Sequence, residues 1–170
     1  MTEISLNILD VAENSIRAEA SLVEISVEVD VDTNRMIIVI KDDGCGMSPE
    51  QTSRVEDPFF TTRTTRKVGL GIPFFKMAAL GTGGDFSITS RVNEGTLVQA
   101  EFVLDHIDRM PLGDISGTIY TLIHFHPDTD FCYRYRYNDR EFVLDTPEVA
   151  EYIREYLTEN KADVDGGAII

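Results

Sequence analysis

Apolar and polar residues alternate along this chain with two different periods, and each period predicts one type of element. Residues 3–19 repeat apolar side chains every three or four positions, which is typical of an amphipathic helix. Residues 23–30 alternate strictly between apolar and polar side chains, so they predict a strand with one buried face. Residues 36–40 are apolar throughout, which predicts a central strand of the same sheet.

The same pattern of helices and strands continues to about residue 104. Ser48 followed by Pro49 is typical of the start of a short helix, because serine caps a helix and proline fits its first position. Residues 57–71 have no apolar period and are expected to form a loop. Residues 72–80 are then expected to form a helix that ends at Gly81. A hairpin is expected from residues 86–91 and 96–104, joined by a turn over 93–95.

The pattern changes near residue 105, where we predict a domain boundary. Residues 106–113 are expected to form a connector that contains Pro111. The chain is therefore predicted to have a unit over 1–104, a small α/β extension over 105–160 and a frayed tail over 161–170. The elements expected in the extension are a helix over 115–125, strands over 131–137 and 141–144, and a helix over 147–157.

Composition narrows the class of protein. The 170 residues include 30 acidic and 15 basic residues, for a net charge of −15. This excess of acid disfavours binding to nucleic acid or to an anionic membrane, and the 42% of apolar residues disfavours a disordered chain. No membrane span or secretory signal is visible, so we expect a cytoplasmic protein. The two cysteines, Cys45 and Cys132, lie too far apart for a disulfide framework or a four-thiolate zinc site.

Three groups of residues could carry chemistry. Asp10 and Asn14 lie four positions apart on one helix face, where their oxygens suit Mg²⁺, but for the helix taken alone a solvated face is the favoured interpretation. Residues 42–46, Asp-Asp-Gly-Cys-Gly, follow the central strand, where a ligand can approach the backbone closely. Residues 69–71, Gly-Leu-Gly, open a helix whose free N–H groups attract phosphate.

Charge supports an anion at the third group. Residues 54–76 contain five basic and two acidic residues, a local charge of +3 that leaves −18 on the rest of the chain. Standard phosphate loops do not fit, because neither GxxxxGK[ST] nor GxGxxG is present. The sequence thus indicates a basic anion-binding segment over residues 54–76 in an otherwise acidic protein. A protein with a cationic face is a natural partner for the acidic surface.

Five ordered segments resemble the boxes of the Bergerat-fold ATPases, which include gyrase-type enzymes, heat-shock chaperones, mismatch-repair proteins and histidine kinases. The resemblance implies an α+β sandwich, a mixed β-sheet with helices on one face. It covers residues 4–104, about 60% of the chain. The segments are Leu9-Asp10-Val11-Ala12-Glu13-Asn14-Ser15, Asp42-Asp43-Gly44-Cys45-Gly46-Met47, Asp57-Pro58-Phe59-Phe60-Thr61-Thr62, Val68-Gly69-Leu70-Gly71-Ile72 and Gly95-Thr96.

The resemblance also implies ATP and Mg²⁺ as cofactors and a role for each matched residue. Asn14 would hold Mg²⁺, Asp42 would accept from the adenine amino group, and Thr96 would support Asp42 or a bridging water. Asp10 stands where these ATPases carry a glutamate general base, and it is one methylene shorter. The remaining nucleotide-binding residues implied are Gly44, Gly46 and Met47 at the base, and Thr62, Gly69, Leu70 and Gly71 at the phosphates. Lys67 stands where many kinases have the first glycine of this box, and together with Arg66 it is expected to supply positive charge to the phosphates.

Three functions remain open at this stage. A regulatory protein kinase comes first, because the lid over about residues 57–68 is short, as in the small anti-sigma-factor kinases. The first helix begins at residue 3, so we expect the phosphoacceptor to be supplied in trans by a partner protein. An ATP-hydrolysing conformational switch and a catalytically silent ATP-dependent binding module are the alternatives. A homodimer is left open.

Two patterns after residue 105 are given structural interpretations. His124, His126, Asp128 and Asp130 alternate like metal ligands, but Pro127 interrupts them, and we expect a structural role. Residues 133–137, Tyr-Arg-Tyr-Arg-Tyr, place tyrosines on one strand face and arginines on the other, which favours an amphipathic strand over a surface that stacks bases.

Overall fold

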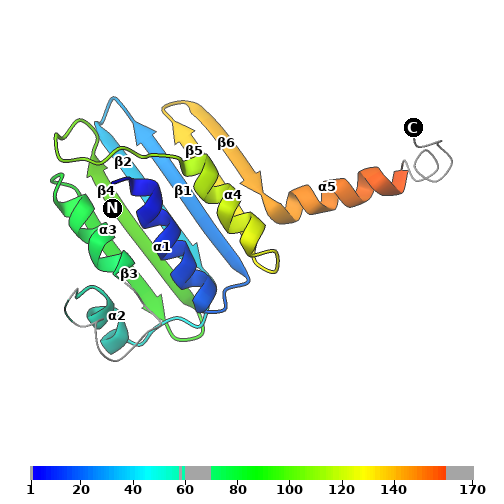
Figure 1. Ribbon diagram of the computed structural model, residues 1–170, viewed down its shortest axis with the longest axis horizontal. Helices are drawn as coiled ribbons and strands as arrows, with labels where there is room; N and C mark the ends of the chain where they lie inside the picture. The colour runs from blue at the N-terminus through cyan, green and yellow to red at the C-terminus, as the bar shows by residue number, and fades with distance from the viewer. Residues whose placement is uncertain (1, 58, 60–69, 160–170) are drawn as a thin grey trace.

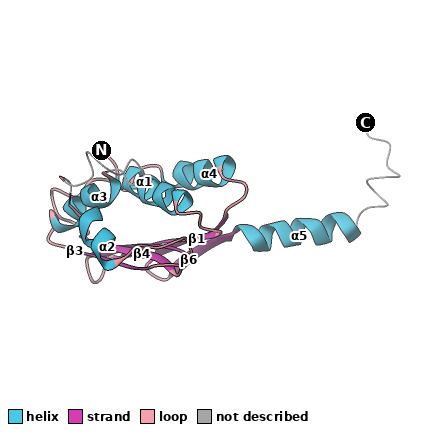
Figure 2. Cartoon of the chain, turned by 90° about the horizontal axis from the view of Figure 1, so that it is seen from below, coloured by secondary structure: helices cyan, strands magenta, loops and turns pink. Residues whose placement is uncertain are grey.

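A single six-stranded sheet with helices on one face forms the body of the protein (Figures 1 and 2). The computed structural model describes residues 2–57, 59 and 70–159. The helices are α1 (Ile4–Arg17), α2 (Pro49–Val55), α3 (Gly71–Leu80), α4 (Ile115–Phe125) and α5 (Thr146–Glu159). The strands are β1 (Leu22–Asp30), β2 (Arg35–Asp42), β3 (Asp85–Arg91), β4 (Gly95–Val103), β5 (Asp130–Tyr137) and β6 (Arg140–Asp145).

The sheet is mixed, with the strand order β3-β4-β2-β1-β5-β6. All neighbouring strands are antiparallel except β1 and β5, which are parallel. This arrangement confirms the predicted fold class, and the elements expected among the described residues are present, with ends that differ by one or two residues. The loop expected over 57–71 and the tail over 161–170 fall largely or wholly outside the described residues.

The part of the chain after residue 105 continues this sheet. β5 pairs along its whole length with β1, and β6 pairs with β5. The connector before α4 also contacts the first helix, because the backbone N–H groups of Ile4 and Ser5 donate to the carbonyls of Pro111 and Leu112 at 2.9 and 2.8 Å. Whether residues 105–160 form a unit of their own stays a prediction.

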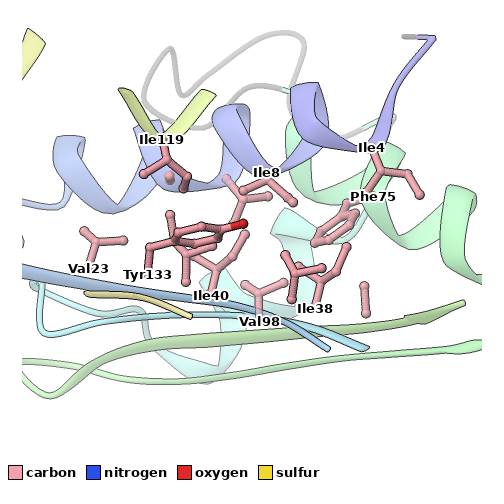
Figure 3. Packing of buried hydrophobic residues seen from close by; sticks show 14 of the residues in the cluster. Ile4, Ile8, Val23, Ile38, Ile40, Phe75, Val98, Ile119 and Tyr133 are labelled. Carbon is pink, nitrogen blue, oxygen red and sulfur yellow. The ribbon is translucent and has the colours of Figure 1, made fainter. Parts of the chain in front are cut away.

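The core lies between the sheet and the layer of α1, α3 and α4 (Figure 3). Alternation along each strand decides which side chains enter it: Val23 and Ile25 of β1 face the helices together with Ile40 of β2. α1 supplies Ile4, Ile8, Val11 and Ala12 at helical spacing, and all four are buried. Because Asp42 lies two residues after Ile40 on the same strand, it too points to the helix side.

The other face of the sheet is polar and carries ion pairs between neighbouring strands. Lys41 contacts Glu24 at 3.2 Å, and Arg134 contacts Glu141 at the same distance. Tyr133 and Tyr135 lie on the helix side, so the predicted separation of tyrosines from arginines on this strand is confirmed. No helix among the described residues is both long and apolar enough to cross a bilayer.

Candidate functional site

Asp42, the last residue of β2, is buried with 8% of its surface exposed and held in one orientation. The hydroxyl of Ser15 donates to its Oδ2 at 2.6 Å, and the backbone N–H of Gly44 donates to its Oδ1 at 2.9 Å. Each carboxylate oxygen keeps a lone pair for a further donor. The end of β2 therefore presents a fixed hydrogen-bond acceptor on the helix side of the sheet.

Ser15 was missed as a site residue by the sequence analysis. It falls in the apolar stripe of the first helix, where it looked like a small core residue. A signal was present nevertheless, since a buried hydroxyl needs a hydrogen-bond partner and a carboxylate was expected at the end of the neighbouring strand.

The loop after Asp42 is tightly enclosed, and its glycines have no room for a side chain. Gly46 has a φ of +65°, and a Cβ there would lie 1.9 Å from the carbonyl oxygen of Arg91. A Cβ on Gly44 would lie 2.8 Å from the carbonyl oxygen of Ala18. The backbone N–H of Cys45 donates to that same carbonyl at 2.9 Å, so the loop is fixed to the end of α1.

Thr96 is the direct cross-strand partner of Asp42. Its Oγ1 lies 2.8 Å from the Oγ of Ser90, and that Oγ also accepts from the backbone N–H of Met47 at 2.8 Å. Ser90 therefore links Thr96 to the glycine loop by hydrogen bonds to both. Its expected support of Asp42, or of a water at the base, stays a prediction.

Asp10 and Asn14 lie on α1 one turn apart, and both are partly exposed. The Nδ2 of Asn14 is buried and has no hydrogen-bond partner within the described part of the chain, while its Oδ1 accepts from Arg17 at 3.4 Å. An orphaned buried amide is unusual in a folded protein and points to a ligand that is needed to satisfy it. Partial burial raises the pKa of Asp10 above its usual value, against the opposing charge of Arg17.

The start of α3 lies against this face of α1. A Cβ on Gly71 would lie 2.9 Å from the Cβ of Asp10, so only glycine allows this approach without a shift. Leu70, at the N-cap position, makes no side-chain capping hydrogen bond. The first N–H groups of a helix attract anions, and here they open beside Asp10 and one turn from Asn14.

The structure thus brings together most of the predicted site residues that it describes. Asp10, Asn14 and Ser15 occupy about 7.5 Å of α1. They connect the start of α3 to Asp42 and its glycine loop. Four of the predicted phosphate-binding residues, Thr62, Arg66, Lys67 and Gly69, lie outside the described residues.

Other polar residues near the site have structural roles. Asp43 accepts hydrogen bonds from the backbone N–H groups of Ser21 and Leu22 at 2.8 and 3.0 Å, and the Ser21 hydroxyl and these N–H groups lower its pKa. It therefore anchors the start of β1. His126, at the end of α4, contacts Glu13 of α1 at 2.9 Å. Within the described ranges, no three His, Cys, Asp or Glu side chains gather as metal ligands.

Comparison with protein families identifies the fold that this geometry represents. Residues 3–106 match the family described as histidine kinase-, DNA gyrase B- and HSP90-like ATPases. The chain belongs to this ATPase family. The matched range includes Asp10, Asn14, Asp42 and Thr96, and the resemblance to the Bergerat-fold ATPases is confirmed.

The individual relatives include proteins named as sensor proteins and as sensor histidine kinases. Sensor protein SrrB of Staphylococcus aureus is 31% identical over 101 residues, which cover 56% of this chain and 17% of that protein. An NtrY-like sensor histidine kinase of Rickettsia conorii is 27% identical over 108 residues, 64% of this chain and 18% of that protein. The chain therefore spans less than a fifth of the length of these curated relatives.

A solved structure shares the fold. The Aquifex aeolicus MutL ATPase domain, complexed with ADP, superposes with a TM-score of 0.50 at 15% identity. The match covers 85% of this chain and 63% of the MutL chain.

Proposed function

We propose that this chain binds Mg-ATP between α1, the glycine loop after β2 and the start of α3, and transfers the γ-phosphate to a partner protein. The observation that carries the proposal is the carboxylate of Asp42, buried and oriented by Ser15 and Gly44. A fixed acceptor at a glycine loop suits the amino group of adenine. The ADP in the MutL domain supports a nucleotide as the ligand.

The residues at the other end of the site fit a metal-bound triphosphate. The amide oxygen of Asn14 is an oxygen ligand of the kind that Mg²⁺ prefers, and the Nδ2 of the same side chain, which has no partner among the described residues, is a donor for a phosphate oxygen. Mg²⁺, when bound, supplies positive charge that offsets the charge of the phosphates. The start of α3 offers backbone N–H groups to the same phosphates, and the close approach of Gly71 to Asp10 keeps them near α1.

Asp10 is the proposed general base. The Cβ of Asp10 lies where α1 meets the start of α3, which puts this residue beside the proposed phosphate position. Partial burial raises its pKa, which makes it a better proton acceptor than an exposed aspartate. We propose that it takes the proton of an acceptor side chain from a partner protein, in keeping with the relative that is named as a sensor histidine kinase.

Hydrolysis is the second candidate function. The same partly buried carboxylate could orient water instead of a protein side chain, which would make the chain an ATP-driven conformational switch. A silent ATP-dependent binding module is the third outcome. We propose a cytoplasmic location, because all three functions need ATP.

Nucleotide binding is tested with Asp42→Asn, because asparagine keeps the size of the side chain but turns one acceptor into a donor. We expect the affinity for Mg-ATP, measured by calorimetry, to fall by about ten-fold or more. The matched control is Asp43→Asn, which changes the neighbouring carboxylate outside the site and keeps Oδ1 for the Ser21 and Leu22 N–H groups. Equal affinities for the two variants would contradict the site.

The three functions differ in the fate of the phosphate. Incubation with γ-labelled ATP and cell extract, followed by separation of labelled proteins, reports transfer to a partner, with Asp10→Asn as the inactive control. Label on a partner supports the kinase, steady phosphate release without a partner supports the switch, and ATP binding with neither supports the silent module.

A further inference from the structure

A contact between α1 and α4 joins the helix of the proposed nucleotide site to the part of the chain that follows the matched family segment. α4 lies beside α1 (Figures 1 and 2), and at its end Nε2 of His126 lies 2.9 Å from Oε1 of Glu13. Since an ionised carboxylate only accepts hydrogen bonds, the imidazole is the donor. The carbonyl of His126 accepts from the N–H of Thr129 at 3.1 Å, so this histidine also belongs to the turn that leads into β5.

Glu13 lies on the part of α1 that carries the proposed phosphate and metal residues. It directly precedes Asn14 and follows Asp10 by three residues. Partial burial raises the pKa of Asp10, the charge of Arg17 opposes this rise, and the charge of Glu13 adds to it. The charges of Glu13 and Arg17 therefore both act on the proposed site.

Arg17 lies within reach of two side chains on its own helix. It follows Glu13 by four residues, the spacing at which an acidic and a basic side chain pair on a helix, and the acidic residue stands first, which is the favoured order. It also follows Asn14 by three residues, and in the structure its guanidinium donates to Oδ1 of Asn14 at 3.4 Å. While His126 holds Glu13, Arg17 thus lies on the oxygen that is proposed to bind the metal.

Arg17 and a metal ion compete for this oxygen. The guanidinium and Mg²⁺ are both positively charged, so they repel each other when they approach the same amide oxygen. The Nδ2 of Asn14 is not involved, because it has no hydrogen-bond partner in the part of the chain that the structure describes. An arginine that pairs with Glu13 instead would leave Oδ1 of Asn14 available to the metal.

We propose that Glu13 exchanges between His126 and Arg17, and that through this exchange the chain after residue 105 regulates the binding of Mg-ATP. The inference rests on the proposed function. With Glu13 on His126, as in the structure, Arg17 stays on Asn14 and weakens the metal site. When the end of α4 moves away, Glu13 pairs with Arg17 and the oxygen of Asn14 is released. A partner that shifts the turn after α4 would therefore raise the affinity for Mg-ATP.

The test measures ATP binding to the full chain by calorimetry, once in Mg²⁺ and once in excess chelator. The Kd in chelator divided by the Kd in Mg²⁺ reports what the metal contributes, and changes that act on ATP alone cancel in this ratio. His126→Ala should raise the ratio about two- to five-fold, because it releases Glu13 to Arg17. The matched control is His124→Ala at the same end of α4, where the ring stacks on Tyr120 at 5.5 Å between centroids, and it should leave the ratio unchanged.

Two further variants test the exchange itself. Glu13→Gln removes the charge that pairs with Arg17, so adding His126→Ala to it should not raise the ratio. Arg17→Ala, at an exposed position, removes the competing donor, so it should raise the ratio alone, and His126→Ala should add nothing to it. Circular dichroism confirms that each variant is folded.

The outcomes separate this inference from the proposed function. A ratio that is unchanged or lower in His126→Ala or in Arg17→Ala would overturn the exchange, and so would a gain that persists when Glu13→Gln is added to His126→Ala. A wrong nucleotide site gives a different result, because Asp42→Asn and Asp43→Asn would then bind ATP equally well.

Discussion

The hydroxyl of Ser15 on α1 lies 2.6 Å from Oδ2 of Asp42 at the end of β2. This buried hydrogen bond joins two elements of the site: the helix that carries Asp10 and Asn14, and the strand end that leads into the glycine loop. Ser15 follows Asn14 directly in the chain. The orientation of Asn14, the proposed metal ligand, and that of Asp42, the proposed hydrogen-bond acceptor for adenine, therefore depend on one another.

Ser15→Ala should lower both stability and nucleotide affinity. The substitution leaves a buried carboxylate oxygen without its donor, which costs about 1–3 kcal/mol of the free energy of unfolding. Urea denaturation measures this loss, and calorimetry with Mg-ATP should show weaker binding. Ser53→Ala, an exposed serine on α2, is the matched control and should change neither quantity. Wild-type behaviour of Ser15→Ala would mean that the hydroxyl does not hold Asp42.

Gly46→Ala should destabilise the protein strongly. The new Cβ would lie 1.9 Å from the carbonyl oxygen of Arg91, and the φ of +65° is unfavourable for alanine, so the loop must move. Gly83→Ala separates the two causes, because its φ is +77° but the nearest atom to a Cβ is 3.9 Å away. We expect a loss of about 1–2 kcal/mol for Gly83→Ala and a larger loss for Gly46→Ala in thermal or urea unfolding. Equal losses would show that the loop has room.

Asn14→Ala should weaken Mg-ATP binding without weakening the fold. The Nδ2 of Asn14 has no partner among the described residues, so its removal leaves no other buried group unsatisfied. We expect the affinity to fall by about 10–100-fold in Mg²⁺, as for other groups that support a bound metal. The affinity in excess chelator should match that of the wild type. Unchanged affinity in Mg²⁺ would refute the assignment of Asn14.

Asp10→Asn should stabilise the protein at neutral pH while abolishing turnover. The folded pKa of Asp10 is raised above its unfolded value by burial, so the ionised side chain destabilises the fold. The protonated side chain, by contrast, favours the folded state. This contribution to the free energy of unfolding is complete below the unfolded pKa of 3.8 and is lost as the pH rises through the folded pKa. The stability difference between variant and wild type should therefore grow from pH 3 to pH 7. A stability difference that does not change with pH would mean that the substitution acts through side-chain packing and not through the ionisation of Asp10.

Local patterns predicted the elements well for a physical reason. The strict alternation over residues 23–30 follows from a strand with one covered face, and the helical repeat of Ile4, Ile8 and Val11 follows from a helix on that face. Glycines at 44, 46 and 71 were expected to make room for a ligand, and that role stays a prediction; the structure shows each of them close to a protein residue, Ala18, Arg91 and Asp10 respectively. The periodic features, by contrast, depend on residues close together in the sequence.

The sequence by itself determined the elements, their order and the ATPase family, because periodicity and five short boxes are local properties. Only the tertiary structure decided that Ser15 holds Asp42, since the two residues lie 27 positions apart and meet only when α1 packs on β2. It also decided that β5 joins β1 in parallel and that α5 extends away from the body of the protein. Strand pairing and the direction of a helix after a strand depend on register and on connection length, which residue patterns do not encode.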